Sequence, residues 1–121
     1  MKKYSEEHQW VEIGADGIAT IGISQFAADE LGEITFIELP EAGKTVKAKE
    51  PLCVIESVKA ASDVYAPIGG TVCEVNTALE KKPEDLNSAP EGNAWICRLS
   101  NPQVADLELL MDEVQYKEFI R

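Results

Sequence analysis

One stretch of the chain organises the rest, and it reads Pro51-Leu52-Cys53-Val54-Ile55-Glu56-Ser57-Val58-Lys59-Ala60-Ala61-Ser62-Asp63-Val64-Tyr65-Ala66-Pro67. Two apolar, β-prone segments run into and out of its polar centre. A proline bounds each end, and prolines are tolerated at strand ends but not inside central ladders. The stretch therefore predicts a β-hairpin with Lys59 at its tip. That lysine is either an ordinary solvated side chain or one held out for modification.

Length and charge narrow the class of protein. The chain has 121 residues, of which 45% are hydrophobic and 27% charged, as expected for one globular domain. Its 22 acidic and 11 basic residues give a net charge of −11. Such a surface repels phosphate backbones and anionic lipids, so we expect no nucleic-acid or membrane partner. Proteins with basic docking faces are the expected partners.

The remaining composition argues against several kinds of site. We expect a cytoplasmic protein, because no apolar run suits a membrane span or a signal peptide. Cys53, Cys73 and Cys97 lie far apart in aliphatic runs and are expected to be buried free thiols. With His8 as the one histidine, no metal-ligand spacing occurs and no metal site is expected. The sequence offers an attachment point and no visible catalytic set.

Short strands are predicted on both sides of the central hairpin. Alternation and β-prone composition indicate them at 9–13, 18–23, 33–39, 71–76 and 95–99. Ser24 is the predicted N-cap of a short helix over 25–31, which Gly32 ends. Helices are expected again over about 103–121. This pattern predicts a mainly β fold, a sandwich or flattened barrel, with short helices and a C-terminal helical appendage.

A short internal sequence repeat flanks the hairpin. Pro40-x-x-Gly43 recurs as Pro67-x-x-Gly70, and each copy is followed within two residues by a Thr-Val pair. The Pro-x-x-Gly turn is common in β proteins, so its placement is more informative than its residues. The arrangement is what two similar halves of a sheet meeting at the hairpin would give.

The run Glu56-Ser57-Val58-Lys59-Ala60-Ala61-Ser62-Asp63 resembles the lipoylation motif of the glycine cleavage system H-protein family. The likeness extends from Lys3-Tyr4 through Leu31-Gly32-Glu33 to the C-terminal helices. It implies a hybrid barrel-sandwich fold and a single lipoyl-carrier domain over 1–121, with lipoate in amide linkage to Lys59.

Lipoyl domains in general carry glycines sixteen residues before and eleven after the modified lysine, and Gly43 and Gly70 stand at those positions. The resemblance also implies that Glu56 belongs to the lipoylation motif. A cleft on the carrier would hold the loaded arm, and Gln9 and Asp63 are the residues expected to contact it there.

The function implied by the resemblance is that of a non-catalytic, monomeric carrier. It would shuttle an aminomethyl group from glycine decarboxylase to an aminomethyltransferase, with dihydrolipoyl dehydrogenase reoxidising the arm. A lipoyl or octanoyl transferase would attach the arm. The acidic surface suits weak docking to several such enzymes.

Three departures from the family pattern support an alternative. Gln9 stands where the family usually has glutamate, Glu30 replaces a histidine, and Glu91 lies in a changed Pro90–Trp95 segment. A charged hydrogen bond is worth roughly twice a neutral one, so Gln9 weakens the expected hold on an amine. The alternative is an H-like lipoyl carrier or lipoyl relay not competent in glycine cleavage.

Three less favoured readings remain. A biotin carrier usually has methionines beside its lysine, where this chain has Val58 and Ala60. A lipoyl domain of a 2-oxoacid dehydrogenase would be followed by a linker and a catalytic domain. An acidic β domain that only binds proteins would leave the chain-wide likeness unexplained.

Overall fold

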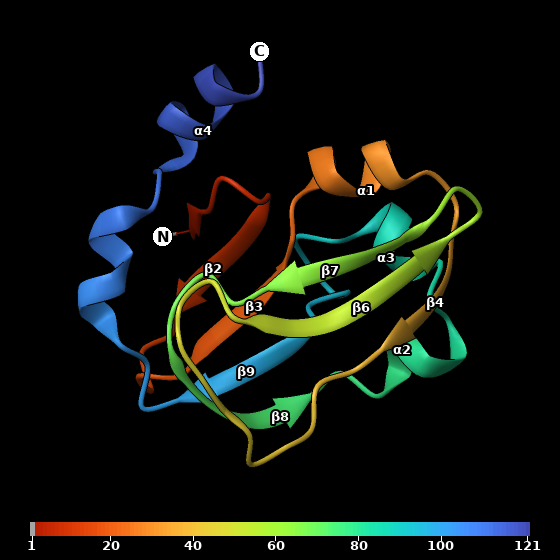
Figure 1. The fold of residues 1–121 in the computed structure, drawn as a ribbon. Helices are drawn as coiled ribbons and strands as arrows, with labels where there is room; N and C mark the ends of the chain where they lie inside the picture. The colour runs from red at the N-terminus through yellow and green to blue at the C-terminus, as the bar shows by residue number, and fades with distance from the viewer. Residues whose placement is uncertain (1) are drawn as a thin grey trace.

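The protein is built around two antiparallel sheets in the computed structural model, which describes residues 2–121 (Figure 1). The larger sheet has the strand order β1-β2-β3-β9-β8-β5 and the smaller one β4-β6-β7. The strands are β1 (Lys2–Tyr4), β2 (Gln9–Ile13), β3 (Ala19–Ile23), β4 (Ile34–Glu38), β5 (Thr45–Val46), β6 (Pro51–Ser57), β7 (Ala61–Tyr65), β8 (Gly70–Val75) and β9 (Cys97–Ser100). The predicted mainly β class is confirmed.

Short helices lie at the ends of the sheets: α1 (Gln25–Leu31), α2 (Ala78–Lys81), α3 (Asp85–Ser88), the 3₁₀ helix η1 (Val104–Leu109) and α4 (Glu113–Phe119). The predicted start of α1 is confirmed, because the Ser24 hydroxyl accepts a hydrogen bond from the Ala27 amide at 3.1 Å. Within residues 2–121, no helix is long and apolar enough to cross a membrane.

The core lies between the two sheets and under α1. Its fully buried side chains come from both sheets and from the loops that join them: Val11, Ile21, Ile55, Ile68, Ile96 and Leu99. Alternate burial is clear in β9, where Cys97 and Leu99 are buried, whereas β2 and β3 each bury three consecutive residues because both of their faces are covered. Packing of the two inward faces against each other therefore fixes where the β6–β7 hairpin stands.

The cysteine prediction is correct at two positions and wrong at the third. Cys53 and Cys97 are buried, whereas Cys73 is exposed. Its neighbour Val72 on β8 points into the core, so the side chain of Cys73 points outward. Burial raises the pKa of the Cys97 thiol to about 12 and also raises that of Cys53, which makes both thiols unreactive.

The two copies of the internal sequence repeat pair with each other. Thr45 of β5 lies opposite Thr71 of β8, and their hydroxyl oxygens are 3.0 Å apart. Gly70 faces Val46, and a Cβ on Gly70 would come within 3.0 Å of the Leu99 side chain. The glycine is therefore needed for the close approach of β8 to β9.

The C-terminal segment is tied to the N-terminal strand. Tyr4 and Met111 exchange two backbone hydrogen bonds of 2.8 Å, and the Tyr4 and Tyr116 rings stack with their centroids 4.3 Å apart. The predicted helical appendage is thus present. Its first part is the 3₁₀ helix η1, which buries no residue, and not the expected amphipathic α-helix.

We expect Gly22→Ala to lower the free energy of unfolding by about 2–3 kcal/mol, because it overpacks the core. Gly22 pairs with Trp10, which is 2% exposed and donates through Nε1 to the Pro90 carbonyl at 2.9 Å. A Cβ on Gly22 would lie 2.7 Å from that Nε1. Urea unfolding of both proteins measures the loss. A matched control is Gly92→Ala, whose Cβ would approach the Ala89 carbonyl only to 4.0 Å, and equal losses would contradict the argument.

Candidate functional site

The β6–β7 hairpin ends in a tight turn with exposed Lys59 at its tip, as predicted. The last ladder contact is the Ser57 amide, which donates to the Ala60 carbonyl at 2.9 Å. The Ser57 hydroxyl accepts from the backbone amides of Lys59 at 3.2 Å and Ala60 at 3.4 Å. A serine before the lysine therefore fixes the backbone of the turn.

The tip also rests on the C-terminal end of α1. The Val58 amide donates to the Glu33 carbonyl at 3.0 Å, and Lys59 Nζ donates to the Glu30 carbonyl at 3.2 Å. A Cβ on Gly32 would lie 3.2 Å from Lys59 Cε, so the lysine stem crosses directly over that glycine. Carbonyls at a helix C-terminus attract cations. The lysine is exposed but has a resting position.

A cavity of about 200 Å³ opens beside this tip, between α1, the turn before β2 and the edge strand β7. Ile23, Ile55 and Val64 supply buried apolar side chains to its lining. Polar residues from three separate segments complete it: Glu7, Gln9, Glu30, Ser62 and Asp63. The cavity can take an aliphatic chain that ends in a polar or cationic group.

Gln9 lines this cavity, but its amide is committed to its own neighbours. The side chain is 3% exposed. Its Oε1 accepts from the Ser5 hydroxyl at 2.7 Å, and its Nε2 donates to the Glu7 carbonyl at 2.9 Å. These bonds hold the turn between β1 and β2 in shape. Gln9 is therefore a structural part of the wall.

Three carboxylates line the cavity in addition to Gln9. Asp63 comes from β7, Glu30 from α1 and Glu7 from the turn before β2. Sequence reasoning singled out Asp63, treated Glu30 only as a departure from a pattern, and missed Glu7. The sequence held no signal for Glu7, because it lies in a turn and His8 after it has a left-handed backbone, so the alternation of an extended chain does not apply there.

Glu56 lies outside the cavity. It is exposed on β6, opposite Phe36 and Ala61, while its neighbour Ile55 points into the core. Of the residues predicted beside Lys59, Gln9 and Asp63 line the cavity, whereas Glu56 does not.

His8 joins the cavity wall to the C-terminal helix. It is half-buried at a backbone φ of +73°, and its Nδ1 lies 2.7 Å from the Tyr116 hydroxyl. That hydroxyl is 2.8 Å from Ser24 Oγ. If Ser24 donates to Tyr116 and Tyr116 donates to His8, each of these hydroxyl hydrogens has an acceptor. The imidazole then carries its hydrogen on Nε2.

We expect His8 to make the protein less stable in mild acid. Burial lowers the pKa of its imidazole below the ordinary 6.5, and the nearby charges of Glu30 and Glu7 oppose that shift only in part. The unfolded chain therefore binds this proton more tightly than the folded protein. The stability from neutral His8 is fully present above the unfolded pKa and is lost as the pH falls through the folded one.

The measurement is the melting temperature from roughly pH 7.5 to pH 5, compared with His8→Asn. Asparagine tolerates the left-handed backbone of this position and does not titrate. The carboxylates titrate in both proteins, so their effect cancels in the comparison. The wild-type protein should lose more stability than the variant over this range, and parallel pH profiles would contradict the assignment.

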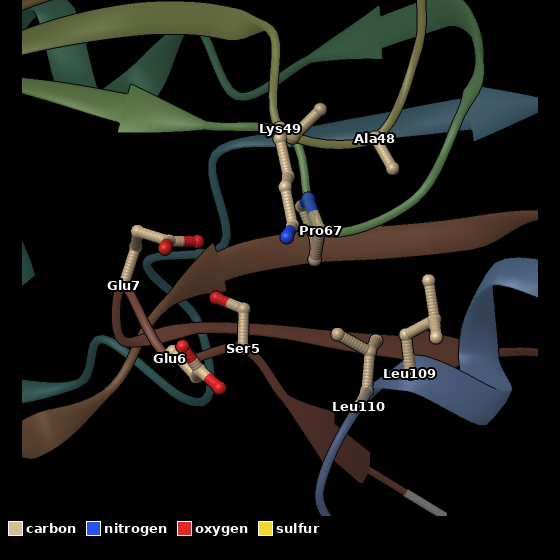
Figure 2. A pocket seen from close by; sticks show the side chains of 9 residues that line it. Ser5, Glu6, Glu7, Ala48, Lys49, Pro67, Leu109 and Leu110 are labelled. Atoms are coloured by element: carbon tan, nitrogen blue, oxygen red, sulfur yellow. The ribbon is translucent and has the colours of Figure 1, made fainter.

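A second cavity, of about 230 Å³, lies at the other end of the same hairpin (Figure 2). Lys49 points toward it across from Leu109 and Leu110, at a backbone φ of +74°. Its amide donates to the Ala66 carbonyl at 2.7 Å. Glu7 lines both cavities. Lys49 is thus an exposed lysine on the same hairpin unit but away from the tip.

Two sheets packed as a sandwich, with an exposed lysine on a tight hairpin beside a small cavity, define the lipoyl-type class of carrier proteins. The family model described as "Glycine cleavage H-protein" matches residues 2–121. The chain belongs to the glycine cleavage H-protein family. The likeness inferred from its motifs is confirmed.

Individual relatives agree with this assignment. The glycine cleavage system H protein of Halorhodospira halophila is 46% identical over 118 residues, covering 98% of this chain and 91% of that protein. The Thermotoga maritima protein of the same name is 46% identical over 119 residues, covering 98% and 95%. The crystal structure of an H protein from Mycobacterium marinum superimposes with a TM-score of 0.88 at 33% identity, covering 97% of this chain and 94% of that one.

Proposed function

We propose that Lys59 carries the lipoyl group through which this protein acts in glycine cleavage. As a member of the H-protein family, the protein is a lipoyl carrier that moves an aminomethyl group. The observation that carries the proposal is the exposed lysine at the tip of a tight hairpin, bordered by a cavity of about 200 Å³. Lys49 lies at the far end of the hairpin and lacks the turn that presents Lys59.

The residues around Lys59 fit a lipoyl amide. Among the described residues, its Nζ has one hydrogen-bond partner, the Glu30 carbonyl at 3.2 Å, which is easily given up. Gly32 leaves room beside the lysine stem. When attached, lipoate supplies a disulfide that accepts the aminomethyl group and is regenerated by oxidation of the dithiol. The apolar part of the cavity suits the aliphatic part of such an arm.

We infer that Asp63, Glu30 and Glu7 hold the amine of the cargo. All three carboxylates line the cavity, and a hydrogen bond to a charged group is stronger than a neutral one. The charge that the family usually has at position 9 is therefore supplied from other positions. Gln9 keeps the turn in shape through Ser5. This distribution favours the glycine-cleavage reading over a lipoyl relay without that chemistry.

The remaining parts of the proposal concern partners and location. The protein is a non-catalytic subunit that docks in turn on glycine decarboxylase, an aminomethyltransferase and dihydrolipoyl dehydrogenase, and a lipoyl or octanoyl transferase loads it. A net charge of −11 suits weak docking to basic faces. The buried free thiols Cys53 and Cys97 are typical of the reducing cytoplasm. We expect the carrier to be a monomer.

The test is the exchange of the glycine carboxyl carbon with labelled bicarbonate, catalysed by a glycine decarboxylase. Lipoylated protein should support the exchange in proportion to its concentration, and unlipoylated protein should not. A fully lipoylated protein that supports no exchange would favour the relay function instead.

A further inference from the structure

Three residues from separate segments form a closed ring of hydrogen bonds. The Ser24 amide donates to the His8 carbonyl at 2.9 Å. The Tyr116 hydroxyl lies 2.8 Å from Ser24 Oγ and 2.7 Å from His8 Nδ1. Ser24 caps α1, His8 belongs to the turn between β1 and β2, and Tyr116 lies on α4. The ring therefore joins the C-terminal helix to two segments that meet at the cavity beside Lys59.

The same two segments supply two of the carboxylates that line the cavity. Glu7 comes directly before His8 in the turn, and Glu30 lies on α1. The separation of these carboxylates therefore depends on how the turn is held against the helix. Tyr116 is 4% exposed and is not one of the residues that line the cavity. Its hydroxyl can affect the cavity only through His8 and Ser24.

Packing leaves the members of the ring little freedom. The Tyr116 side chain is stacked on Tyr4, with the ring centroids 4.3 Å apart. The His8 ring packs against Phe26 of α1 at a centroid distance of 4.8 Å, and the His8 backbone is left-handed, with φ of +73°. Such a backbone is unfavourable for a residue other than glycine. The hydrogen bonds to the His8 carbonyl and imidazole therefore hold the turn in a conformation that costs free energy.

We propose that Tyr116 is a positioning residue for retention of the cargo, because its hydroxyl holds the turn and α1 at the separation where Glu7 and Glu30 both reach the amine. The inference rests on the proposed function, in which these carboxylates hold the aminomethyl group. Without the hydroxyl, the ring of hydrogen bonds opens and the turn is free to move away from the helix. The amine then loses a partner, and water reaches the cargo sooner.

The ring also leaves the two carboxylates available to the cargo. If Ser24 donates to Tyr116, the tyrosine hydroxyl donates to Nδ1 and the neutral imidazole carries its hydrogen on Nε2. Burial lowers the pKa of this imidazole, although the charges of Glu30 and Glu7 oppose that effect. A neutral imidazole forms no ion pair with either carboxylate. Both negative charges therefore remain for the amine.

The positioning is tested first in the unlipoylated full-length protein, by NMR of isotope-labelled histidine and by amide hydrogen exchange. Tyr116→Phe removes the hydroxyl and keeps the stacked ring. The His8 signal should change from the Nε2–H tautomer to a mixture, and the Ser24 amide should exchange about three to ten times faster, as expected for the loss of one hydrogen bond. Tyr4→Phe is the matched control. Its hydroxyl belongs to the same stacked pair but donates to Glu91 at 2.6 Å, so this variant should leave His8 and Ser24 unchanged.

The second measurement is the release of ammonia from the isolated lipoylated carrier loaded with the aminomethyl group. Tyr116→Phe should release its cargo about three to ten times faster than the wild-type protein, and Tyr4→Phe at the wild-type rate. His8→Asn removes the other end of the same hydrogen bond. The double variant of His8→Asn and Tyr116→Phe should therefore release cargo no faster than the faster single variant.

An unchanged His8 signal in Tyr116→Phe, or a wild-type rate of release, would overturn the positioning role. Equal acceleration by Tyr4→Phe would also overturn it, because the effect would then be one of general stability. Additive effects in the double variant would contradict action through His8. A wild-type carrier that gains lipoate but takes up no aminomethyl group would refute the proposed function and the retention role together, whatever the NMR shows. Circular dichroism checks that every variant is folded.

Discussion

The Lys59→Arg variant should gain no lipoyl mass when it is produced with lipoate and an active lipoyl ligase, whereas the wild-type protein gains one lipoyl amide. Arginine keeps the positive charge, but its guanidinium stays protonated and is not a nucleophile toward an acyl donor. The fold should be unaffected, because the side chain is exposed and contacts the protein through the Glu30 carbonyl. Intact-mass spectrometry measures the shift.

Lys49→Arg is the matched control for this experiment. Lys49 is also exposed and borders the same hairpin, but it lies at the end away from the turn. This variant should be lipoylated to the wild-type extent. A lipoyl mass that persists in Lys59→Arg and disappears in Lys49→Arg would move the attachment site to the second cavity.

The second large effect concerns retention of the cargo. In lipoylated protein loaded with the aminomethyl group, we expect Asp63→Asn combined with Glu30→Gln to release the cargo roughly ten to a hundred times faster. Each substitution replaces a charged hydrogen bond, worth about 1.5–3 kcal/mol, with a neutral one worth about 0.5–1.5 kcal/mol, so each costs about 1 kcal/mol and the two together give the expected change in rate. Release of ammonia from the isolated loaded carrier measures the rate.

Glu56→Gln provides the comparison for this prediction, because Glu56 is an exposed carboxylate of the same hairpin that does not line the cavity. It should release the cargo at the wild-type rate. Glu7→Gln tests the third carboxylate by itself. If the rim variants and Glu56→Gln release cargo equally fast, the carboxylates do not hold the amine.

Local chemistry explains which parts of the fold the sequence could predict. The hairpin around Lys59 is bounded by Pro51 and Pro67, and the helix after Ser24 begins with its own cap, so both are set by adjacent residues. The internal sequence repeat predicted that two similar halves of a sheet meet at the hairpin, and Thr45 does pair with Thr71. The hairpin and the helix depend on neighbours in the chain, so the local sequence pattern predicts them.

The cavity could not be predicted in the same way. Its carboxylates come from residues 7, 30 and 63, which approach one another only after both sheets and α1 have packed. In the sequence, Gln9 stands out only as a position that lacks the negative charge usual in the family. The hydrogen bonds to Ser5 and Glu7 that give it a structural role depend on the shape of a turn. The outward direction of Cys73 likewise depends on which residue of β8 faces the core.

The tie between Tyr4 and Met111 has a consequence for biosynthesis. A nascent chain can pair residues 51–67 as soon as they leave the ribosome, because the hairpin is local. Tyr4 waits for its partner strand segment at Met111, and His8 waits for Tyr116. The attachment lysine is thus displayed before the wall of the cavity is finished. A ribosome-stalled fragment that ends before Met111 would be open to acylation but unable to shield a cargo.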